Sequence, residues 1–374
     1  MIKVVQFIHG MCMGGAETLV KEYCLKLDKT KFEVVLLCLN RCNTPYEEIL
    51  EKENIKIIYV DDFFSDKIRK GKNIFCKVFR RFLYFKNIKK IIENEKPDII
   101  HTHLTLNKFL LFVKFSKKIK IFHTVHTEPK LLWTNGFDEY IDKLSLKILK
   151  RKYFLRFITL HKEMNNEVNN IFNVSNSIVL NNGIDFDKFK GVQTKTQIRI
   201  EEKIPNDAFV VGNIGRLSNA KNQLFLIDVF EEIYAKNNNA FLIIVGKGIL
   251  RKKIEEKIRN KGLEKRCLIL EERTDVPRLM KIMDVFVFPS LYEGLGIVLI
   301  EAQKSKIPCI VSDKIPDNAI ISNLVKKVNL KDSIEKWTDE IINFSIDDIR
   351  YTNLEDWNIN NVINKLERIY EDKI

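Results

Sequence analysis

The chain alternates short apolar runs with longer segments of helical spacing. In its first half the apolar runs cover residues 2–8, 32–38, 55–60, 98–101, 119–125, 154–159 and 177–180. Helix-length segments lie between most of these runs. Short runs without polar alternation are typical of strands that are buried on both faces of a sheet. Because such strands alternate with helices, the pattern predicts a doubly wound parallel sheet.

A second series of the same kind follows the polar stretch 188–207. Its apolar runs cover residues 209–214, 240–245, 266–270, 284–288 and 308–311, and the chain ends in an amphipathic helical pattern over 358–374. A length of 374 residues suits two domains. We therefore predict an α/β protein with two Rossmann-like domains, the first over residues 1–186 and the second over residues 187–355.

The charge is distributed unevenly between the two series. Residues 1–185 hold 32 Lys and Arg against 21 Asp and Glu, a net charge of +11, whereas the remainder holds 31 against 29, a net charge of +2. The basic half therefore predicts an acidic partner for the first domain only.

The seven cysteines are odd in number, scattered and without a C-x-x-C pair. We therefore expect neither a disulfide framework nor a zinc ribbon, and a reducing compartment fits. The first eight residues lead directly into a strand, without the layout of a signal peptide. No apolar run reaches the ~18 residues of a transmembrane helix, so we expect a soluble or peripheral protein.

The most informative stretch runs from Pro289 to Glu301, where an apolar run ends in a glycine-bearing turn before a helical pattern. Such a turn leaves backbone N–H groups unpaired at the positive end of a helix, which suits an anion. Gly294 and Gly296 allow the backbone to approach a ligand. Glu293 and Glu301 could both face one pocket. An ordinary strand-to-helix connection with two surface glutamates is the alternative.

Cationic residues and glycines follow other strands of the prediction. Arg216 and Lys221 flank a turn after the first strand of the second series and could hold a diphosphate. Ligands of open parallel sheets lie at the carboxyl ends of the strands. The turn after the first strand of the chain contains Gly14 and Gly15 but is not a G-x-G-x-x-G fingerprint.

These segments together resemble the retaining glycosyltransferases of family 4, in particular the bacterial exopolysaccharide and capsule branch. The resemblance rests on two Glu separated by seven residues inside S-L-Y-E-G-L-G-I-V-L-I-E-A, on G-R-L-x-x-x-K-N and on N-G-I-D, and it extends from Gly14 to Asp313. It implies the GT-B fold, in which two Rossmann-like domains face a central cleft. The first would bind the acceptor and the second the nucleotide sugar, and the last helix, residues 356–374, would cross back onto the first domain.

The resemblance also assigns roles to individual residues. His126, Glu293, Arg216 and Lys221 would form the catalytic group. Donor-binding residues would be Gly14, Gly15, Gly215, Arg216, Lys221, Gly246, Lys247, Arg273, Thr274, Val276, Glu293, Gly294, Leu295, Gly296, Ile297 and Glu301. Glu301 would hold the ribose hydroxyls and Glu293 the sugar. The anomeric configuration would be retained, without a metal or a cofactor other than the nucleotide sugar, because the departing diphosphate takes up the acceptor proton.

All six histidines lie in the first half of the chain. His101 with His103 and His123 with His126 could suggest a metal site, but neither H-x-x-x-H nor a cluster of acidic ligands accompanies them. His126 follows a strand at the position that resembles the active-site histidine of the family. A half-buried histidine at a strand end is the structural alternative. We expect His161 at the surface.

Residues 67–90 predict a basic helix that carries aromatic side chains. The candidate surface consists of Phe75, Phe79, Arg80, Arg81, Phe82 and Lys86. Such a helix suits an anionic lipid surface. Phenylalanines that point into the domain core, with solvated cations around them, are the equally open alternative. Residues 143–156 repeat the pattern.

We therefore expect a cytoplasmic enzyme, peripheral on the inner face of the cell membrane. It would pass a sugar from a nucleoside diphosphate sugar, which we expect to be UDP-linked, to a lipid-linked or polysaccharide acceptor. Two other classes stay open. One is a nucleotide-sugar epimerase or phosphorylase of the same fold. The other is a basic nucleic-acid-binding protein, against which the absence of a recognition motif and the near-neutral second half argue.

Overall fold

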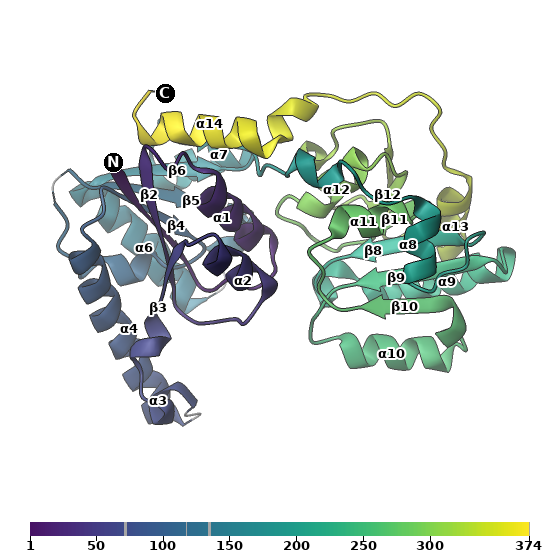
Figure 1. Cartoon of the computed structure of the whole chain (residues 1–374), viewed down its shortest axis with the longest axis horizontal. Helices are drawn as coiled ribbons and strands as arrows, with labels where there is room; N and C mark the ends of the chain where they lie inside the picture. Colours follow the sequence, from purple (N-terminus) through teal and green to yellow (C-terminus); the bar gives the residue numbers. More distant parts are fainter. Residues whose placement is uncertain (71–72, 117, 134–135, 374) are drawn as a thin grey trace. The chain divides into compact units, whose positions relative to one another are not determined.

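The computed structural model describes residues 1–70, 73–116, 118–133 and 136–373. The chain forms two compact units, and helices alternate with strands in both of them (Figure 1). Unit 1 comprises Met1–Gly183 together with Ile359–Ile374, and unit 2 comprises Ile184–Asn358. Unit 2 is therefore inserted into the sequence of unit 1.

Unit 1 contains a seven-stranded sheet in the order β3-β2-β1-β4-β5-β6-β7, and all neighbouring strands are parallel. Its strands are β1 (Ile2–Ile8), β2 (Phe32–Cys38), β3 (Lys56–Tyr59), β4 (Ile99–His103), β5 (Lys120–Thr124), β6 (Phe154–Thr159) and β7 (Ile178–Val179). These strands confirm the seven apolar runs of the first series. The strand order changes direction between β1 and β4, which makes the carboxyl ends of these two strands the switch point of the sheet.

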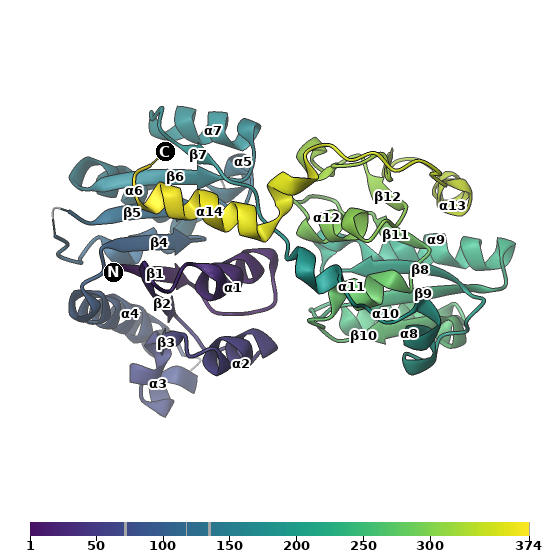
Figure 2. The ribbon, with the colours of Figure 1, turned by 45° about the horizontal axis from the view of Figure 1, so that its top comes forward.

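The helices of unit 1 cover both faces of this sheet. They are α1 (Gly15–Lys26), α2 (Pro45–Lys52), α3 (Asp66–Lys70), α4 (Ile74–Glu95), α5 (Pro129–Leu132), α6 (Phe137–Lys152), α7 (Lys162–Phe172) and α14 (Ile359–Tyr370). Helices α1 and α14 share one core with Val4 and Ile158, and Figure 2 shows them side by side. Because strand side chains alternate between faces, the neighbouring Phe157 points the other way and stacks on Phe172 of α7, with ring centroids 4.5 Å apart.

Unit 2 contains a six-stranded parallel sheet in the order β10-β9-β8-β11-β12-β13. Its strands are β8 (Phe209–Ile214), β9 (Ala240–Val245), β10 (Cys267–Leu270), β11 (Val285–Phe288), β12 (Cys309–Ser312) and β13 (Val325–Val328). The first five confirm the second series of apolar runs. Strand β13 was not predicted, because its sequence carries Lys326 and Lys327 between two valines at the sheet edge.

The helices of unit 2 are α8 (Lys195–Glu201), α9 (Gln223–Lys236), α10 (Arg251–Asn260), α11 (Val276–Lys281), α12 (Ile297–Lys304) and α13 (Ile334–Asn343). Helices α9, α10 and α13 share a core with strand residues such as Val211, and Trp337 of α13 is fully buried in it. Helix α11 packs against α8 and α12. This arrangement leaves the turns after β8, β9 and β11 at one edge of the sheet.

Candidate functional site

The carboxyl edge of the second sheet is built from turns that are bonded to one another through their backbones. Gly215, directly after β8, donates its N–H to the Val245 carbonyl at 2.9 Å, and Leu217 donates to the Lys247 carbonyl at 2.9 Å. A Cβ on Gly246 would lie 2.1 Å from the Gly215 carbonyl oxygen. Only glycine therefore permits this close approach of the two turns.

The structure brings together two of the predicted residues, Lys221 and Glu293, which are 72 positions apart. The Lys221 ammonium donates to Glu293 Oε1 at 2.5 Å, and the side chains are only 19% and 8% exposed. The ammonium also lies 4.7 Å from the centre of the Phe288 ring. A pair with so little solvent around it is held strongly, and an anionic ligand arriving here would meet a cation that is already positioned.

Two hydrogen bonds fix the turns that carry this pair. The N–H of Leu291 donates to the Ala220 carbonyl at 2.8 Å, and Asn222 Nδ2 donates to the Pro289 carbonyl at 3.1 Å. The short 3-10 turn that ends at Lys221 is thereby joined to the turn that contains Glu293. The ion pair thus lies on two rigid backbone segments rather than on a free loop.

Helix α12 begins directly after this turn. Gly296 is its N-cap with φ of +79°, a left-handed conformation that glycine adopts without strain, and no side chain caps the helix. The first N–H groups of any helix lack a partner further along it, and here the N–H of Leu299 donates to the carbonyl of the N-cap Gly296 at 2.8 Å. The N–H groups of Ile297 and Val298 come before it in the first turn. Leu295 is buried, whereas Gly294 is half-buried. Glu301 is half-buried on the same helix, a little over one turn further along.

The remaining predicted donor residues occupy neighbouring turns. Arg216 and Lys247 are exposed, and Gln223, itself fully buried, donates to the Arg216 carbonyl at 3.1 Å. Burial raises the pKa of Glu272 after β10, and the positive charges of Lys247 and Arg216 oppose that rise. The side chains of Lys247 and Arg216 are therefore both close enough to Glu272 to favour its charged form.

Arg273 lies in a different environment from the other predicted cations. Its guanidinium donates to both carboxylate oxygens of Asp275, at 2.8 and 2.7 Å, and to Glu202 at 3.2 Å. Thr274 is exposed, and Val276 is half-buried at the start of α11. The Arg273 side chain is thus already engaged in a network of ion pairs with α8.

In unit 1 the predicted glycine turn leads into α1. Gly14 is the N-cap of this helix in an extended conformation, no side chain caps it, and Gly15 is its first residue. Cys12 in the preceding turn forms a disulfide with Cys42. This bond was not expected from the sequence. The two cysteines meet because they follow β1 and β2, which are neighbours in the sheet, although they are 30 residues apart in sequence.

The predicted histidines lie on β4, on β5 and just beyond β5, at the switch point of the first sheet. His101 and His103 are on the face that α1 and α14 cover, and both are fully buried. His103 Nδ1 lies 3.0 Å from His126 Nε2, and His103 Nε2 lies 2.9 Å from Gln6 Oε1. Burial lowers the pKa of His126 to about 4, and the pKa values of His101 and His103 fall well below the ordinary value. These three imidazoles are therefore neutral at physiological pH.

His123 points to the opposite face of the sheet and belongs to a separate polar cluster. Its Nδ1 lies 2.9 Å from Thr102 Oγ1 and 3.2 Å from Asn107 Nδ2. The backbone N–H of Asn107 donates to Asp142 Oδ1 at 2.8 Å. Burial lowers the pKa of His123 to about 3 and raises the pKa of Asp142 to about 6. His101 and His103 therefore lie on one face of the sheet, and His123 lies on the other.

Among the residues for which coordinates are described, no group of three or more His, Cys, Asp or Glu side chains could hold a metal ion. The expectation that His161 lies at the surface was wrong. Its side chain is 6% exposed, caps α7 by accepting from the Met164 N–H at 3.2 Å, and lies 3.0 Å from Glu128 Oε1. Burial works against its charged form, but Glu128 and Glu163 outweigh burial and raise its pKa.

Several partners of the histidines were not found from the sequence, among them Gln6, Asp142 and Tyr370, whose hydroxyl lies 2.6 Å from His101 Nδ1. Gln6 is the one polar side chain that follows Lys3 within the apolar run of β1, and it is fully buried. A polar residue in such a run is a signal for a buried hydrogen bond. Tyr370 and Asp142 lie on amphipathic helices, where the sequence pattern gives no comparable signal.

The predicted basic stretch contains α3 and α4, and three phenylalanines of α4 are exposed. A fourth, Phe85, is half-buried and packs on Phe109, with ring centroids 4.9 Å apart. The exposed fractions are 82% for Phe75, 50% for Phe79 and 60% for Phe82. Helix α6 adds Phe137 and Tyr140, which are 75% and 61% exposed. The alternative in which these three phenylalanines of α4 fill the core is therefore wrong. Large exposed aromatic groups that gather on one unit mark an interaction surface.

The two helices of this surface are tied by charge. Arg81 of α4 forms an ion pair with Asp138 of α6, and Lys108 forms a second one with the same carboxylate at 3.1 Å. Arg80 donates to the Arg69 carbonyl at 3.1 Å, and Lys86 is exposed. In the part of the chain with described coordinates, no helix is both long and apolar enough to span a bilayer.

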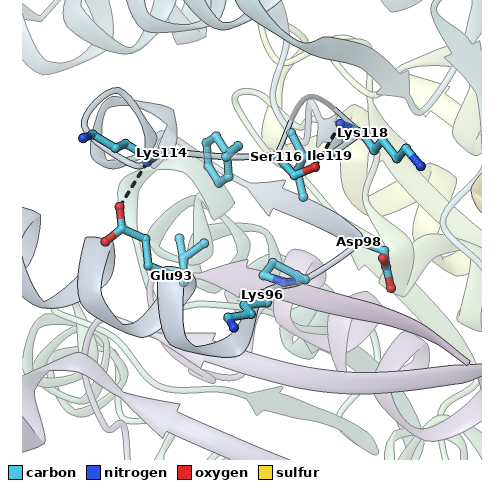
Figure 3. Close-up of a pocket in the computed structure, with 10 residues that line it drawn as sticks. Glu93, Lys96, Asp98, Lys114, Ser116, Lys118 and Ile119 are labelled. Atoms are coloured by element: carbon cyan, nitrogen blue, oxygen red, sulfur yellow. Dashed lines mark hydrogen bonds between the residues drawn. The ribbon is translucent and has the colours of Figure 1, made fainter.

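A pocket at the other end of the first sheet is a weaker candidate for the site. Figure 3 shows it next to the segments that precede β4 and β5, with Lys96, Asp98, Lys114 and Lys118 around it. Glu93 accepts the backbone N–H of Lys114 at 3.2 Å. Ligands of open parallel sheets bind beyond the carboxyl ends of the strands, and this pocket lies at the amino ends.

Two family models match consecutive parts of the chain. The model for Glycosyltransferase Family 4 matches residues 13–188, and the model for Glycosyl transferases group 1 matches residues 194–360. The two matches lie almost entirely in unit 1 and in unit 2 respectively.

The chain also resembles curated bacterial proteins over most of its length. It is 29% identical over 304 residues to the UDP-Gal:alpha-D-GlcNAc-diphosphoundecaprenol alpha-1,3-galactosyltransferase of Escherichia coli, covering 76% of this chain and 78% of that protein. It is 24% identical over 386 residues to the capsular polysaccharide biosynthesis glycosyltransferase CapH of Staphylococcus aureus, covering 100% and 99%.

Among solved structures, the fold matches Anabaena Alr3699/HepE in complex with UDP-glucose. The TM-score is 0.69 at 17% sequence identity, with 100% of this chain and 99% of that chain covered. At this identity the match concerns the fold, and it identifies the two parallel-sheet units as those of the GT-B architecture.

Proposed function

The chain belongs to glycosyltransferase family 4 and has the GT-B fold, and from this premise we propose that it transfers a sugar from a UDP-sugar to a lipid-linked glycan with retention of anomeric configuration. The acceptor class follows the relatives, one of which is named for a diphosphoundecaprenol acceptor and another for capsular polysaccharide synthesis. The UDP carrier follows the same galactosyltransferase and the UDP-glucose complex of the structural neighbour.

The observation that carries this proposal is the Lys221–Glu293 pair beside the uncapped start of α12. A nucleoside diphosphate brings two negative phosphates, which need positioned cations and backbone N–H groups. In this proposal Lys221 and Arg216 neutralise the diphosphate, and the first N–H groups of α12 bind its oxygens. Glu293 then accepts from the sugar hydroxyls, and Glu301 accepts from the ribose hydroxyls.

The reaction breaks the bond between the anomeric carbon and the diphosphate oxygen. A bond from the same face of the sugar to the acceptor oxygen replaces it, which retains the configuration. The acceptor hydroxyl proton passes to the departing diphosphate, so that no separate base is required. Cations that already face the diphosphate stabilise the negative charge that develops on it, and this replaces a metal ion in that role. His126 of unit 1 contributes a hydrogen bond to a substrate hydroxyl.

Unit 1 would bring the enzyme to its acceptor through the exposed face of α4 and α6. Each basic residue near an anionic bilayer contributes roughly 1 kcal/mol, and aromatic side chains enter the interface. The exposed Phe75, Phe79 and Phe82 and the charges of Arg80, Arg81 and Lys86 supply both contributions. In this proposal the protein is peripheral on the inner face of the cell membrane.

A transfer assay tests the function directly. The protein is incubated with each of several UDP-sugars and with undecaprenyl-diphosphate-linked mono- and oligosaccharides, with and without a metal chelator. We expect one donor to yield a glycosylated lipid in either condition, with an NMR coupling constant that shows the retained anomeric configuration. Inversion would contradict the mechanism, and release of an epimerised UDP-sugar without acceptor would indicate an epimerase instead.

A further inference from the structure

A chain of buried hydrogen bonds leads from the last helix to His126. Tyr370 of α14, which is fully buried, accepts from Gln6 Nε2 at 3.0 Å. The other end of the Gln6 amide, Oε1, lies 2.9 Å from His103 Nε2, and His103 Nδ1 lies 3.0 Å from His126 Nε2. Strands β1 and β4, the segment after β5 and helix α14, which are far apart in sequence, therefore contribute to a single polar chain.

The direction of each hydrogen bond follows from the Gln6 amide. Because Gln6 Oε1 can only accept, His103 Nε2 must carry the proton. His103 is neutral, since burial holds its pKa well below the ordinary value, and its Nδ1 is therefore a lone-pair acceptor. His126 must then donate from Nε2. In a neutral imidazole this leaves His126 Nδ1 with a lone pair and no proton.

The nitrogen at the end of this chain is unsatisfied. Within the described residues, His126 Nδ1 is buried and has no hydrogen-bond partner. A buried polar atom without a partner is costly and calls for an explanation, such as a ligand. A lone-pair acceptor of this kind is complementary to a hydroxyl group that donates.

The other end of the chain is anchored as well. Tyr370 OH lies 2.6 Å from His101 Nδ1, and His101 Nε2 lies 2.7 Å from Thr124 Oγ1. With the Gln6 N–H bound to its oxygen, the phenol donates its own proton to His101 Nδ1, and His101 Nε2 then donates to Thr124. All these hydrogen bonds thus run in the same direction, with the donors on the side of His126 and the acceptors on the side of Thr124. Hydrogen bonds aligned in this way polarise one another.

We infer that Tyr370, Gln6 and His103 are positioning residues that hold His126 as the Nε2–H tautomer, so that its Nδ1 accepts a hydrogen bond from a hydroxyl of the sugar substrate. This inference rests on the proposed function for the identity of the hydroxyl, whereas the tautomer itself is a property of the free protein. Its consequence is a preference for a group that donates. A fluorine atom in place of that hydroxyl could only accept and would not substitute for it.

The tautomer can be measured without any substrate. The full chain is labelled with 15N-histidine, and a long-range 1H–15N spectrum is recorded at pH 7.5, with His126→Gln used to assign the His126 signals. We expect neutral His126 with its proton on Nε2. A proton on Nδ1, or a charged ring, would overturn the inference whatever the protein catalyses.

The role of the last helix is tested by Tyr370→Phe, which removes only the hydroxyl. We expect Gln6 to lose its fixed orientation, so that the His126 signals shift toward a mixture of tautomers. Transfer should then show a kcat about tenfold lower, of the order of one hydrogen bond, at unchanged UDP affinity. The matched control is Tyr351→Phe, which removes a hydroxyl that donates to the Gln303 carbonyl at 2.8 Å in unit 2. It should change neither the tautomer nor kcat.

The two arms separate this inference from the proposed function. If no sugar is transferred to any acceptor, the proposed function fails while the spectra still decide the tautomer. If transfer occurs but His126 keeps one tautomer in Tyr370→Phe, the positioning role is refuted and the function stands. Gln6→Leu provides a second variant, in which the same shift of tautomer is expected and its absence again refutes the role.

Discussion

The two units share an architecture but handle polar groups in opposite ways. Unit 2 places a charged pair, Lys221 and Glu293, at the carboxyl edge of its sheet. Unit 1 places the neutral imidazoles of His101 and His103, an amide and a phenol at the corresponding edge and buries them completely, with His126 half-buried beside them. All six histidines of the chain lie in this unit. A charged edge suits the binding of an anion, whereas a chain of neutral dipoles suits the orientation of hydroxyl groups. The same scaffold therefore carries a charged pair in one unit and a chain of neutral dipoles in the other.

The largest effect that would sharpen this comparison is a loss of stability of unit 1 in mild acid. The unfolded chain protonates its histidines below about pH 6.5. The folded state keeps His126 neutral down to a pKa of about 4 and His123 down to about 3. The unfolded state thus binds more protons in this window, and stability falls as the pH falls. His126 alone would remove about 3 kcal/mol by pH 4.

Asp142 opposes this trend. Its raised pKa of about 6 means that the folded state takes up that proton first, so its contribution to stability grows as the pH falls from about 6 to about 4. The raised pKa values of His161 and Asp61 act in the same sense as that of Asp142. The five histidines with lowered pKa values, which are His9, His101, His103, His123 and His126, outweigh these three groups. Hydrogen exchange measured by mass spectrometry at pH 7.5 and pH 5 should show that peptides of unit 1 lose protection while those of unit 2 keep it. Equal loss in both units would break the comparison.

The next effect concerns the exposed face of unit 1. Changing Phe75, Phe79 and Phe82 together to Ser should weaken binding to vesicles that contain anionic lipid at least about 100-fold, because each aromatic group that leaves water contributes about 1.5 kcal/mol. Co-sedimentation measures the binding. The control is Ile249→Ser, which removes an apolar side chain that is 88% exposed in unit 2. If both variants bind the vesicles equally well, this face of unit 1 does not contact the membrane.

A smaller effect is expected at the charged edge of unit 2. Lys221→Ala should weaken UDP binding roughly 30-fold in calorimetry, since a hydrogen bond to a charged group contributes about 2 kcal/mol. The matched control is Lys257→Ala, which breaks a pair with Asp228 at 2.5 Å between α10 and α9. Unchanged affinity in Lys221→Ala would exclude this lysine from the donor site.

Glu293→Gln provides the complementary change of opposite sign. It releases the Lys221 ammonium from its carboxylate, and we expect UDP to bind several-fold more tightly while sugar transfer falls. Weaker UDP binding in this variant would mean that Glu293 serves to hold Lys221 in place rather than to contact the sugar.

The smallest effect is expected from Gly296→Ala. The left-handed φ of +79° costs a residue with a Cβ about 1 kcal/mol, and the new Cβ would lie 3.2 Å from the Phe288 ring. Gly191→Ala is the matched control, because its φ of +62° is also left-handed but no atom lies within 4 Å of the new Cβ. Urea unfolding should therefore show a greater loss for Gly296→Ala. If both variants lose the same free energy of unfolding, the Phe288 ring moves aside for the new Cβ at no cost.

The fold could be predicted largely from the sequence, because buried parallel strands appear as continuous apolar runs. Strands such as β1, β8 and β9 have the predicted bounds. The exception is β13, where two lysines at a sheet edge hide a short strand. Local pattern was sufficient wherever burial on both faces left no room for polar residues.

The candidate site was less predictable, because its geometry depends on contacts between distant residues. The pairing of Lys221 with Glu293 spans 72 positions, and the contact between His101 and Tyr370 spans 269. Similarly, the Cys12–Cys42 bond depends on the neighbouring positions of β1 and β2. The roles of the predicted site residues stay predictions until they are tested. Motifs indicated which residues to consider, whereas the partners of the histidines required the fold.

The insertion of unit 2 into unit 1 has a consequence for the order in which the protein is made. Residue Ile184, where unit 2 begins, donates its N–H to the Trp357 carbonyl at 2.8 Å near the end of the same unit, so the ends of unit 2 meet. A ribosome therefore completes unit 2 before it adds α14. Until Tyr370 emerges, nascent unit 1 lacks both a core helix and the phenol that orders its imidazoles. The fold of unit 1 is therefore completed only after the whole of unit 2 has been translated, because residues 359–370 follow unit 2 in the chain.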